Sequence, residues 1–480
     1  MDTTSSNQHE PKLRLLVVIA SYGEKNLDCL KNIIRTYRSM ALEVDVIVLS
    51  NAGKDLGPGI KVVVGLPAKN PWSLPFGHKK IFADNADAYD LFIYSEDDMA
   101  VTERNIQAFL ELTPRLAPDE IAGYLRYEVG PSGHWTLPEA HGPSHWKPES
   151  IQQRGSITVA EFSNEHAAFY LINRAQLKKS IASGGFLRAP CEGVYDMLCT
   201  AATDPYTICG FRKVICISSL EDFLIHHMTN RYAGQLGLTL DRVREQIQIL
   251  QKISAKAHPA STLCEAESKF FHKRWSKSYD ETPSHELLGM VPNGAATILS
   301  VGCGWGAAES EFKRRGAVVT ALPLDSVVGA AVAQAGIEVI YGSFEQCLAS
   351  LGDRKFDCVL LTDLLHLNSS PGDMLEACAN LVGAGGTLVL GGPNFDFLKV
   401  LLKRLLRMGE FGQLSDYSKS GISLCGPGSL KSHFRKSNLR VDKVDWFNPS
   451  IAGGNGKAAE PKPGRFTARN WILRARRPAA

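Results

Sequence analysis

The chain has 480 residues, 44% hydrophobic and 21% charged, which is enough for two or three domains with separate cores. Fifty-three Lys and Arg against 50 Asp and Glu leave a formal charge of +3. This is too balanced for a protein that binds nucleic acid mainly through phosphate contacts. The 11 cysteines have no metal-ligand spacing and predict reduced thiols. No apolar stretch suits a signal peptide or membrane span, so we expect a cytoplasmic protein.

Two apolar strands that run into glycine-containing turns, at 13–23 and 296–306, each open an α/β domain. After the first opening, helical patterns alternate with short strands, which predicts a mostly parallel sheet covered on both faces. A helical pattern at 240–257 stops at His258-Pro259 and marks the connection between the domains. We predict four segments: a flexible tail (1–10), a first α/β domain (11–235), a helical linker (236–283) and a second α/β domain (284–480). A glycine-rich stretch at 453–464 predicts a loop.

Three acidic residues, Glu96, Asp97 and Asp98, end the apolar strand of YDLFIYSEDDM. Their mutual repulsion favours a bound cation, and oxygen ligands suit Mg²⁺ or Mn²⁺, which can in turn hold a diphosphate. The alternative is a solvated acidic turn that caps the helix beginning near Thr102.

The region 13–232 resembles GT-A glycosyltransferases, in which an acidic DXD-type motif holds a metal against a nucleotide-sugar donor. The resemblance implies donor contacts at Ala20, Ser21, Tyr22 and Asn51, a phosphate-neutralising Lys79, and His226 or His227 as a further metal ligand. An exposed helix face is the alternative for Lys79. Asn164, Glu165 and His166 are candidate acceptor-wall residues.

Glu192 and Asp196 are four residues apart, and in a helix both carboxylates would share one face. An inverting sugar transfer needs one carboxylate to take the acceptor's proton, so this pair supplies the candidate base. Surface capping acids are the alternative.

A second glycine motif, G-x-G-x-G at Gly302, Gly304 and Gly306, follows the strand of ILSVGCGWG. Such glycines let the backbone approach a ligand at a helix N-terminus, and the spacing differs from the dinucleotide fingerprint G-x-G-x-x-G. The region 284–478 resembles class I S-adenosylmethionine-dependent methyltransferases in the order of its motifs.

This second resemblance implies S-adenosylmethionine as cofactor and cofactor contacts near Asp325, Ser343 and Asp363. Family members usually end the second strand with an acid, but Pro323 stands there and Asp325 follows two residues later. Ser343 replaces the usual acid after the third strand. His366 is the candidate general base for an oxygen acceptor, with a polar residue at the pocket rim as the alternative.

The segment 395–411 (FDFLKVLLKRLLRMGEF) combines apolar and basic residues at helical spacing. Three interpretations stay open: a helix resting on an anionic membrane, a lid over the active site, or a helix whose apolar face packs on a core.

Together these patterns predict a bifunctional enzyme with two α/β domains, a GT-A fold followed by a class I methyltransferase fold. The expected partners are a nucleotide-sugar donor and a glycan or lipid-linked glycan acceptor, with peripheral membrane contact and no nucleic acid. Two alternatives stay open: a methyltransferase whose N-terminal domain only recognises a glycan or nucleotide, and a scaffold in which both sites have degenerated.

Overall fold

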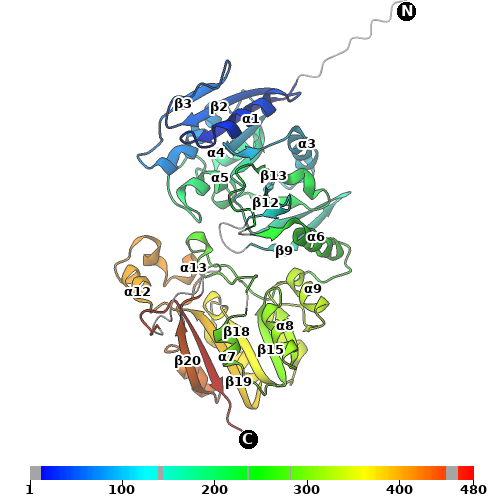
Figure 1. The fold of residues 1–480 in the computed structure, drawn as a ribbon, viewed down its shortest axis with the longest axis vertical. Helices are drawn as coiled ribbons and strands as arrows, with labels where there is room; N and C mark the ends of the chain where they lie inside the picture. Colours follow the sequence, from blue (N-terminus) through cyan, green and yellow to red (C-terminus); the bar gives the residue numbers. More distant parts are fainter. Residues whose placement is uncertain (1–11, 139–143, 235–236, 282, 450–462, 480) are drawn as a thin grey trace, which may run out of the picture. The chain divides into compact units, whose positions relative to one another are not determined.

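The computed structural model describes residues 12–138, 144–234, 237–281, 283–449 and 463–479, and it divides into two compact units. Unit 1 comprises Met1–His141 and Ile151–Ile247, and unit 2 comprises Gly142–Ser150 and Gln248–Ala480. The chain is coloured along its length in Figure 1. The expected tail at 1–10, and most of the expected loop at 453–464, lie outside the described residues.

The main sheet of unit 1 has the order β11-β4-β1-β2-β3. Its strands are β1 (Arg14–Ser21), β2 (Glu43–Ser50), β3 (Lys61–Val64), β4 (Leu91–Glu96) and β11 (Phe169–Asn173). The first four run parallel and β11 runs antiparallel to β4. β1 is buried from Leu15 to Ser21, as expected for a parallel strand covered on both faces. The carboxyl ends of β1, β2 and β4 therefore meet at one edge, where open α/β sheets bind ligands.

Five helices accompany this sheet: α1 (Leu27–Arg38), α2 (Gly77–Asp84), α3 (Glu103–Leu112), α4 (Arg174–Ala182) and α5 (Met197–Thr207). Two smaller sheets have the orders β6-β12-β10-β9 and β14-β8-β7-β13-β5. Their strands are β5 (Met99–Ala100), β6 (Glu120–Ala122), β7 (Leu125–Val129), β8 (Trp135–Leu137), β9 (Trp146–Arg154), β10 (Ile157–Phe162), β12 (Arg212–Cys216), β13 (Leu224–His227) and β14 (Leu238–Thr239). We call residues 96–98 (Glu96, Asp97 and Asp98) the acidic turn. Because β13 pairs with β5, His227 lies opposite Met99, next to the acidic turn.

Unit 2 is built on a seven-stranded sheet of order β17-β16-β15-β18-β19-β21-β20. Its strands are β15 (Thr297–Cys303), β16 (Val318–Pro323), β17 (Glu338–Val339), β18 (Phe356–Thr362), β19 (Val382–Pro393), β20 (Arg440–Phe447) and β21 (Asn470–Arg476). β21 is antiparallel to both of its neighbours, and the other pairs are parallel. The prediction of α/β architecture for this region is thus confirmed.

In the chain, α7 precedes the first strand of this sheet and the other helices of unit 2 lie between its strands. Helices α8 and α9 pack against β16. The helices of unit 2 are α7 (His285–Met290), α8 (Ala307–Arg314), α9 (Ser326–Gln334), α10 (Phe344–Leu351), α11 (Pro371–Asn380), α12 (Leu398–Leu405), α13 (Tyr417–Ser420) and α14 (Lys431–Lys436). Among the described residues, none of the helices combines the length and apolar character needed to cross a membrane.

Among its described residues, the predicted linker forms an α-helix only in α6 (Leu240–Ser254). Residues 261–281 of the same linker are mostly non-helical and pack on the edge of the unit 2 sheet; we call this segment the strap. Leu263 donates its N–H to the carbonyl of Leu324 and accepts from the N–H of Phe344, each at 2.8 Å. These bonds attach the strap to the loops that follow β16 and β17, so it belongs to unit 2.

Candidate active site

The glycine turn of unit 2 connects β15 to α8. Gly302 and Gly306 have φ of +75° and +80°, a region that favours glycine because it lacks a Cβ. A Cβ at Gly302 would collide with the Leu364 side chain, and one at Gly304 with the Tyr279 carbonyl. The turn therefore requires glycine partly because the chain's own residues lie against it.

The strap covers this turn. The N–H of Trp305, inside the glycine motif, donates to the carbonyl oxygen of Tyr279 at 3.1 Å. The cavity beside the turn measures about 20 Å³, room for about one water molecule. A larger ligand at the glycine turn needs residues 277–281 to move.

A buried cation lies at the centre of this region. Lys277 is 1% exposed, and its Nζ donates to Glu281 at 2.6 Å and to Thr362 Oγ1 at 3.3 Å. Although burial disfavours its charged form, Glu281 and Asp363 raise the pKa of Lys277 above its usual value. Burial raises the pKa of both carboxyl groups in turn. The cluster offers one cation and two acids next to a backbone turn, and sequence reasoning missed Lys277 and Glu281.

Two predicted cofactor contacts serve as helix caps. Asp325 Oδ1 accepts hydrogen bonds from the N–H groups of Val327 (2.7 Å) and Val328 (3.0 Å) at the start of α9. Its other oxygen, Oδ2, is buried on the side of the Tyr279 hydroxyl, and burial raises the pKa of Asp325 to about 7 although the Tyr279 hydroxyl lowers it. Ser343 caps α10 through the N–H of Gln346. The Asp325 carboxyl group thus lies between the start of α9 and Tyr279 of the strap, and the Ser343 side chain is engaged in the cap of α10.

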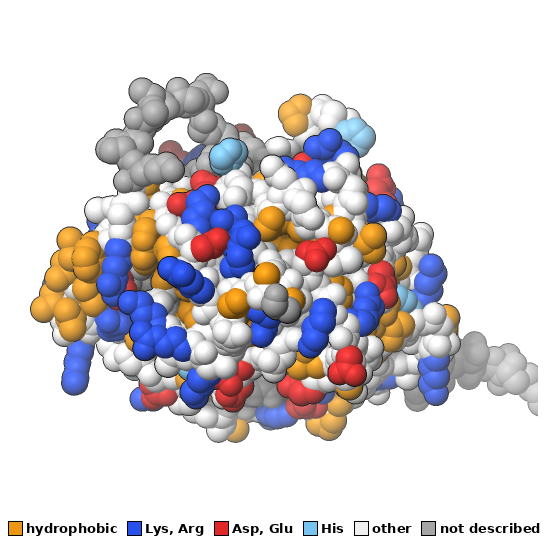
Figure 2. Space-filling view, turned by 90° about the horizontal axis from the view of Figure 1, so that it is seen from below, with side chains coloured by type: hydrophobic (Ala, Val, Ile, Leu, Met, Phe, Trp, Pro, Cys, Tyr) orange, Lys and Arg blue, Asp and Glu red, His pale blue; other side chains and the backbone are white. Residues whose placement is uncertain are grey.

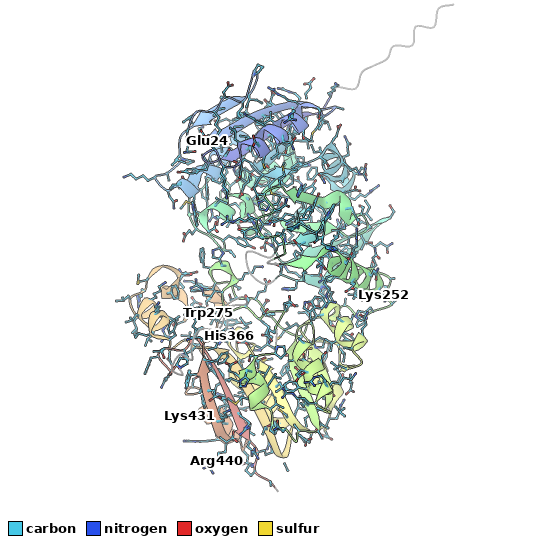
Figure 3. The ribbon with its side chains drawn as sticks, viewed as in Figure 1. Glu24, Lys252, Trp275, His366, Lys431 and Arg440 are labelled. Carbon is cyan, nitrogen blue, oxygen red and sulfur yellow. The ribbon has the colours of Figure 1, made fainter. Side chains whose placement is uncertain are left out.

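His366, the predicted base, is 2% exposed and lies next to the strap residue Trp275 (Figure 3). Its Nε2 is 2.6 Å from the Trp275 carbonyl oxygen, and because a carbonyl only accepts, Nε2 carries the hydrogen and Nδ1 the lone pair. Burial lowers the pKa of His366 to about 4. The ring is thus neutral near pH 7, with Nδ1 as its basic atom.

A second cavity in unit 2, about 350 Å³ in volume, opens where β19 ends. Among its lining residues are Arg404, Arg465 and Trp471. Arg465 pairs with Asp396, which also lines the cavity, at 2.8 Å. The cavity combines cations with an aromatic side chain and has the size of a small-molecule site.

In unit 1 the acidic turn meets the end of β1. Asp97 accepts hydrogen bonds from Ser21 Oγ (2.6 Å) and Asn26 Nδ2 (2.8 Å), and Lys54 Nζ donates to Ser21 Oγ at 2.8 Å. The predicted residues Ser21 and Asp97 are thus brought together. Sequence reasoning missed Asn26 and Lys54, although Lys54 follows the second strand, whose end shares this edge.

Asp98 and His227 are also brought together. His227 Nε2 donates to Asp98 Oδ2 at 3.0 Å, and its Nδ1 bonds Glu128. Although burial opposes the charge, these two carboxylates raise the pKa of His227. Both ring nitrogens thus face carboxylate oxygens, which only accept, and the ring would have to release a hydrogen from one nitrogen to bind a metal.

The predicted metal ligands Glu96, Asp97, Asp98 and His227 are neighbours, but they do not form a metal centre here. Within the residues described, no group of three or more His, Cys, Asp and Glu side chains is arranged to hold a metal ion. Instead, Glu96 Oε1, Asp98 Oδ1 and two nitrogens of Arg126 are buried without hydrogen-bond partners. Burial, reinforced by Asp98, raises the pKa of Glu96 to about 8.

The other residues predicted to contact the nucleotide-sugar donor lie at the same carboxyl edge of the main sheet of unit 1. Ala20 is buried, Tyr22 is 54% exposed, and Asn51 accepts the Gly23 N–H at 2.8 Å. The prediction for Lys79 is wrong: its ammonium is buried against Asp204, which also binds Arg188. Lys79 therefore neutralises a protein carboxylate and is not available to a phosphate.

The two carboxylates predicted to supply the general base, those of Glu192 and Asp196, do not lie on one helix face. Residues 189–195 are not helical, Glu192 is exposed in that segment, and Asp196 is the N-cap of α5, accepting the Cys199 N–H at 2.9 Å. A capping acid is the alternative that the structure favours for Asp196. Of the predicted acceptor wall, Glu165 accepts from Tyr195, and Asn164 accepts from the His166 N–H.

Known proteins are similar to part of this chain. The family described as "Methionine biosynthesis protein MetW" matches residues 283–453. The ubiquinone biosynthesis O-methyltransferase of Xylella fastidiosa (strain 9a5c) is 33% identical over 192 residues, covering 35% of this chain and 74% of that protein. The protein of the same name from Paracidovorax citrulli (strain AAC00-1) is 26% identical over 188 residues, covering 36% and 79%. A solved structure of a SAM-dependent methyltransferase from Archaeoglobus fulgidus is 15% identical, with a TM-score of 0.30, and covers 40% and 90%.

Proposed function

Because the C-terminal part of this chain belongs to the S-adenosylmethionine-dependent methyltransferases, in the family that includes the ubiquinone biosynthesis O-methyltransferases, we propose that unit 2 methylates a hydroxyl oxygen. The observation that carries the proposal is the glycine turn between β15 and α8, at the carboxyl edge of the sheet. When bound, S-adenosylmethionine supplies an electrophilic methyl group.

The residues around the turn suit this cofactor chemically. Asp325 Oδ2 is a buried acceptor beside the Tyr279 hydroxyl, and displacement of residues 277–281 would make it available to the hydroxyl groups of a ribose. Lys277 complements a carboxylate, and Glu281 and Asp363 complement an ammonium group. The ligand needs more room than the cavity of about 20 Å³ provides, so binding displaces residues 277–281.

In this proposal His366 is the base that takes the proton of the acceptor's hydroxyl group. With the methyl group supplied by S-adenosylmethionine, the proton of the acceptor hydroxyl would pass to Nδ1 of His366. The low pKa of His366 makes it a weak base, so we expect an acidic hydroxyl, such as a phenol, as acceptor. The cavity lined by Arg404, Arg465 and Trp471 is the candidate acceptor site.

The Asp325→Asn variant tests the cofactor site. Asn also caps helices well, so the fold is kept, and at pH 8, above the Asp325 pKa of about 7, the variant lacks a negative charge that attracts hydroxyl donors. We expect S-adenosylhomocysteine affinity, measured by calorimetry, to fall about tenfold, in line with the loss of a charge-assisted hydrogen bond. Asp353→Asn, at an exposed position, is the matched control. Failure of the unaltered protein to bind the ligand would contradict the proposal.

A second candidate function belongs to unit 1, in which the edge of β1 and β4 recognises the diphosphate of a nucleotide sugar. It is favoured by the unpartnered buried nitrogens of Arg126, since such donors are costly unless a ligand binds them. Lys54 supplies a further cation. Calorimetry with uridine and guanosine diphosphates, with and without Mn²⁺, tests this candidate and separates recognition from metal-dependent sugar transfer.

A further inference from the structure

The strap covers the glycine turn, and the segment 395–411, for which a lid is one interpretation, does not. Among the described residues, none of those that line the cavity beside the turn belongs to this segment. In its helix α12, Leu398, Leu402 and Leu405 are 49%, 47% and 66% exposed, so the interpretation that this apolar face packs on a core is wrong. In Figure 2, hydrophobic side chains gather at the left edge, the side on which α12 lies in Figure 1. The strap is therefore the element that controls access to the turn.

Tyr279 fills the space that a ligand at the turn would need. Its carbonyl oxygen lies where a Cβ on Gly304 would stand, and it accepts the Trp305 N–H at 3.1 Å. Its hydroxyl is buried beside the carboxyl group of Asp325. The proposed function assigns the ribose hydroxyl groups of the cofactor to this same carboxyl group. Tyr279 thus presents to Asp325 the kind of group that the cofactor would present.

Lys277 presents a positive charge where the cofactor would place one. Its Nζ donates to Thr362 Oγ1 at 3.3 Å at the end of β18, and the next residue, Asp363, favours its charged form. An ammonium group that is 1% exposed needs such partners, because burial of an unpaired charge is costly. The amino-acid part of S-adenosylmethionine also carries an ammonium group, for which Asp363 is a candidate partner. The strap therefore supplies a hydroxyl and an ammonium group to a site that would receive both from the cofactor.

The strap reaches this position through an unfavourable backbone conformation. His272, Lys273 and Trp275 have φ of +54°, +50° and +67°, in the left-handed region that residues other than glycine rarely adopt. Such residues cost conformational free energy and persist where surrounding contacts hold them. One of these contacts is the hydrogen bond from His366 Nε2 to the Trp275 carbonyl oxygen. Displacement of the strap would release this strain, which lowers the free energy needed to open the site.

Residues 144–150 hold the strap in place. The His145 ring stacks on the Tyr279 ring at a centroid distance of 4.4 Å and an interplanar angle of 8°. Glu149 accepts a hydrogen bond from Thr262 Oγ1 at 2.7 Å. We call the His145 stack and the Thr262–Glu149 hydrogen bond the latch. Because Thr262 lies near the start of the strap and Tyr279 near its end, the latch holds both ends.

We propose that the strap is a built-in competitor of the cofactor: Tyr279 and Lys277 occupy the cofactor's place at Asp325 and Asp363, and the latch keeps them there. The inference rests on the proposed function, because it takes S-adenosylmethionine and S-adenosylhomocysteine as the ligands of this site. A ligand that binds only the open protein has an apparent dissociation constant equal to its intrinsic value divided by the open fraction. Loosening the latch should therefore tighten cofactor binding, although it removes stabilising contacts from unit 2.

His145→Ala and Thr262→Val in the full chain test the proposal at pH 8. The first removes the ring stack, and the second removes the hydrogen-bond donor to Glu149. We expect each variant to bind S-adenosylhomocysteine about three- to tenfold more tightly in calorimetry, in line with the loss of one ring stack or one hydrogen bond. The thermal unfolding midpoint of unit 2 should fall in both variants. Because lost structure alone would weaken binding, opposite changes in affinity and stability identify the competitor.

Trypsin provides a measurement that needs no ligand. Lys277 is buried in the closed strap, so the peptide bond after it is cleaved only when the strap opens. Cleavage after Lys277, followed by mass spectrometry, should be about three- to tenfold faster in both variants. His134→Ala, which changes an exposed histidine outside the strap and the latch, is the matched control and should leave affinity and cleavage unchanged.

The failure of this inference and the failure of the proposed function give different results. Equal or weaker S-adenosylhomocysteine binding in both variants, with clear binding to the unaltered protein, would overturn the competitor and leave the proposed function standing. Unchanged cleavage after Lys277 in both variants would overturn the latch. Binding to none of these proteins, despite faster cleavage in the variants, would overturn the proposed function, and the competitor with it.

Discussion

Buried charged residues are compensated in different ways in the two units. In unit 2, Lys277 lies between Glu281 and Asp363, so each charge has an opposite neighbour. In unit 1, Glu96 is close to Asp98 and its Oε1 has no hydrogen-bond donor. An isolated buried carboxylate costs free energy unless it is protonated. The Glu96 side chain is accordingly held in its neutral form at pH 7.

Glu96 therefore makes the stability of unit 1 depend on pH. Its pKa rises from 4.5 to about 8 on folding, so its contribution is most favourable below about pH 4.5 and is lost as the pH rises to about 8. We expect the free energy of unfolding of Glu96→Gln to exceed that of the unaltered protein by a few kcal/mol at pH 8.5 and to match it near pH 4.5. Denaturant titrations at both pH values measure this. A difference independent of pH would contradict the assignment.

Among the secondary-structure elements of unit 2, α10 has an N-terminal cap whose residue is also a predicted cofactor contact. Ser343 accepts the Gln346 N–H while Gln346 reaches back to the Ser343 N–H at 2.9 Å, a capping box. The same serine stands where the family resemblance implies a cofactor contact, so one side chain has two candidate roles.

Ser343→Ala separates these roles. We expect it to lower the free energy of unfolding of unit 2 by about 1 kcal/mol and to leave S-adenosylhomocysteine affinity unchanged. Ser343→Asp keeps a capping oxygen and serves as the control for stability. A tenfold loss of affinity in Ser343→Ala without loss of stability would instead make Ser343 a cofactor ligand.

The sequence predicted the strands and the glycine turn well, because apolar runs, periodicity and glycine spacing are local signals. It failed where a side chain's role depends on a distant partner. Lys79 lies on the expected helix, but its pairing with Asp204, 125 residues away, has no local signature. Asp196 was assigned to a helix face because the helix was assumed to begin earlier than Met197. The strap has no periodic pattern, so neither its path nor the position of Lys277 could be read from the sequence.

At the scale of the whole molecule, the chain enters unit 2 twice, first with residues 142–150 and then from Gln248 onward. The first segment contacts the strap: the His145 ring stacks on Tyr279 with centroids 4.4 Å apart, and Thr262 Oγ1 donates to Glu149 at 2.7 Å. A single cut between the domains, as the sequence suggests at His258-Pro259, therefore removes part of unit 2.

We expect fragment 1–247 to fold, since it holds the whole main sheet of unit 1. Fragment 248–480 should fold with a lower unfolding midpoint than unit 2 has in the full chain, because it lacks residues 142–150. Differential scanning calorimetry of both fragments and the full chain tests this, and His145→Ala in the full chain should reproduce part of the loss. Identical midpoints for fragment 248–480 and the full chain would show that the first segment adds no stability.

The hydrogen bond between the Trp305 N–H and the Tyr279 carbonyl controls how often the glycine turn becomes accessible to a ligand. While that bond is closed, the turn is covered, so the frequency of its opening sets the upper limit on how fast any ligand enters or departs. For a methyltransferase the limit applies twice in each cycle, once to the incoming cofactor and once to the demethylated product, which would then be released slowly. At high pH, where each opening leads to exchange, the exchange rate of the Trp305 amide hydrogen in deuterated water measures this opening frequency, before any substrate is identified.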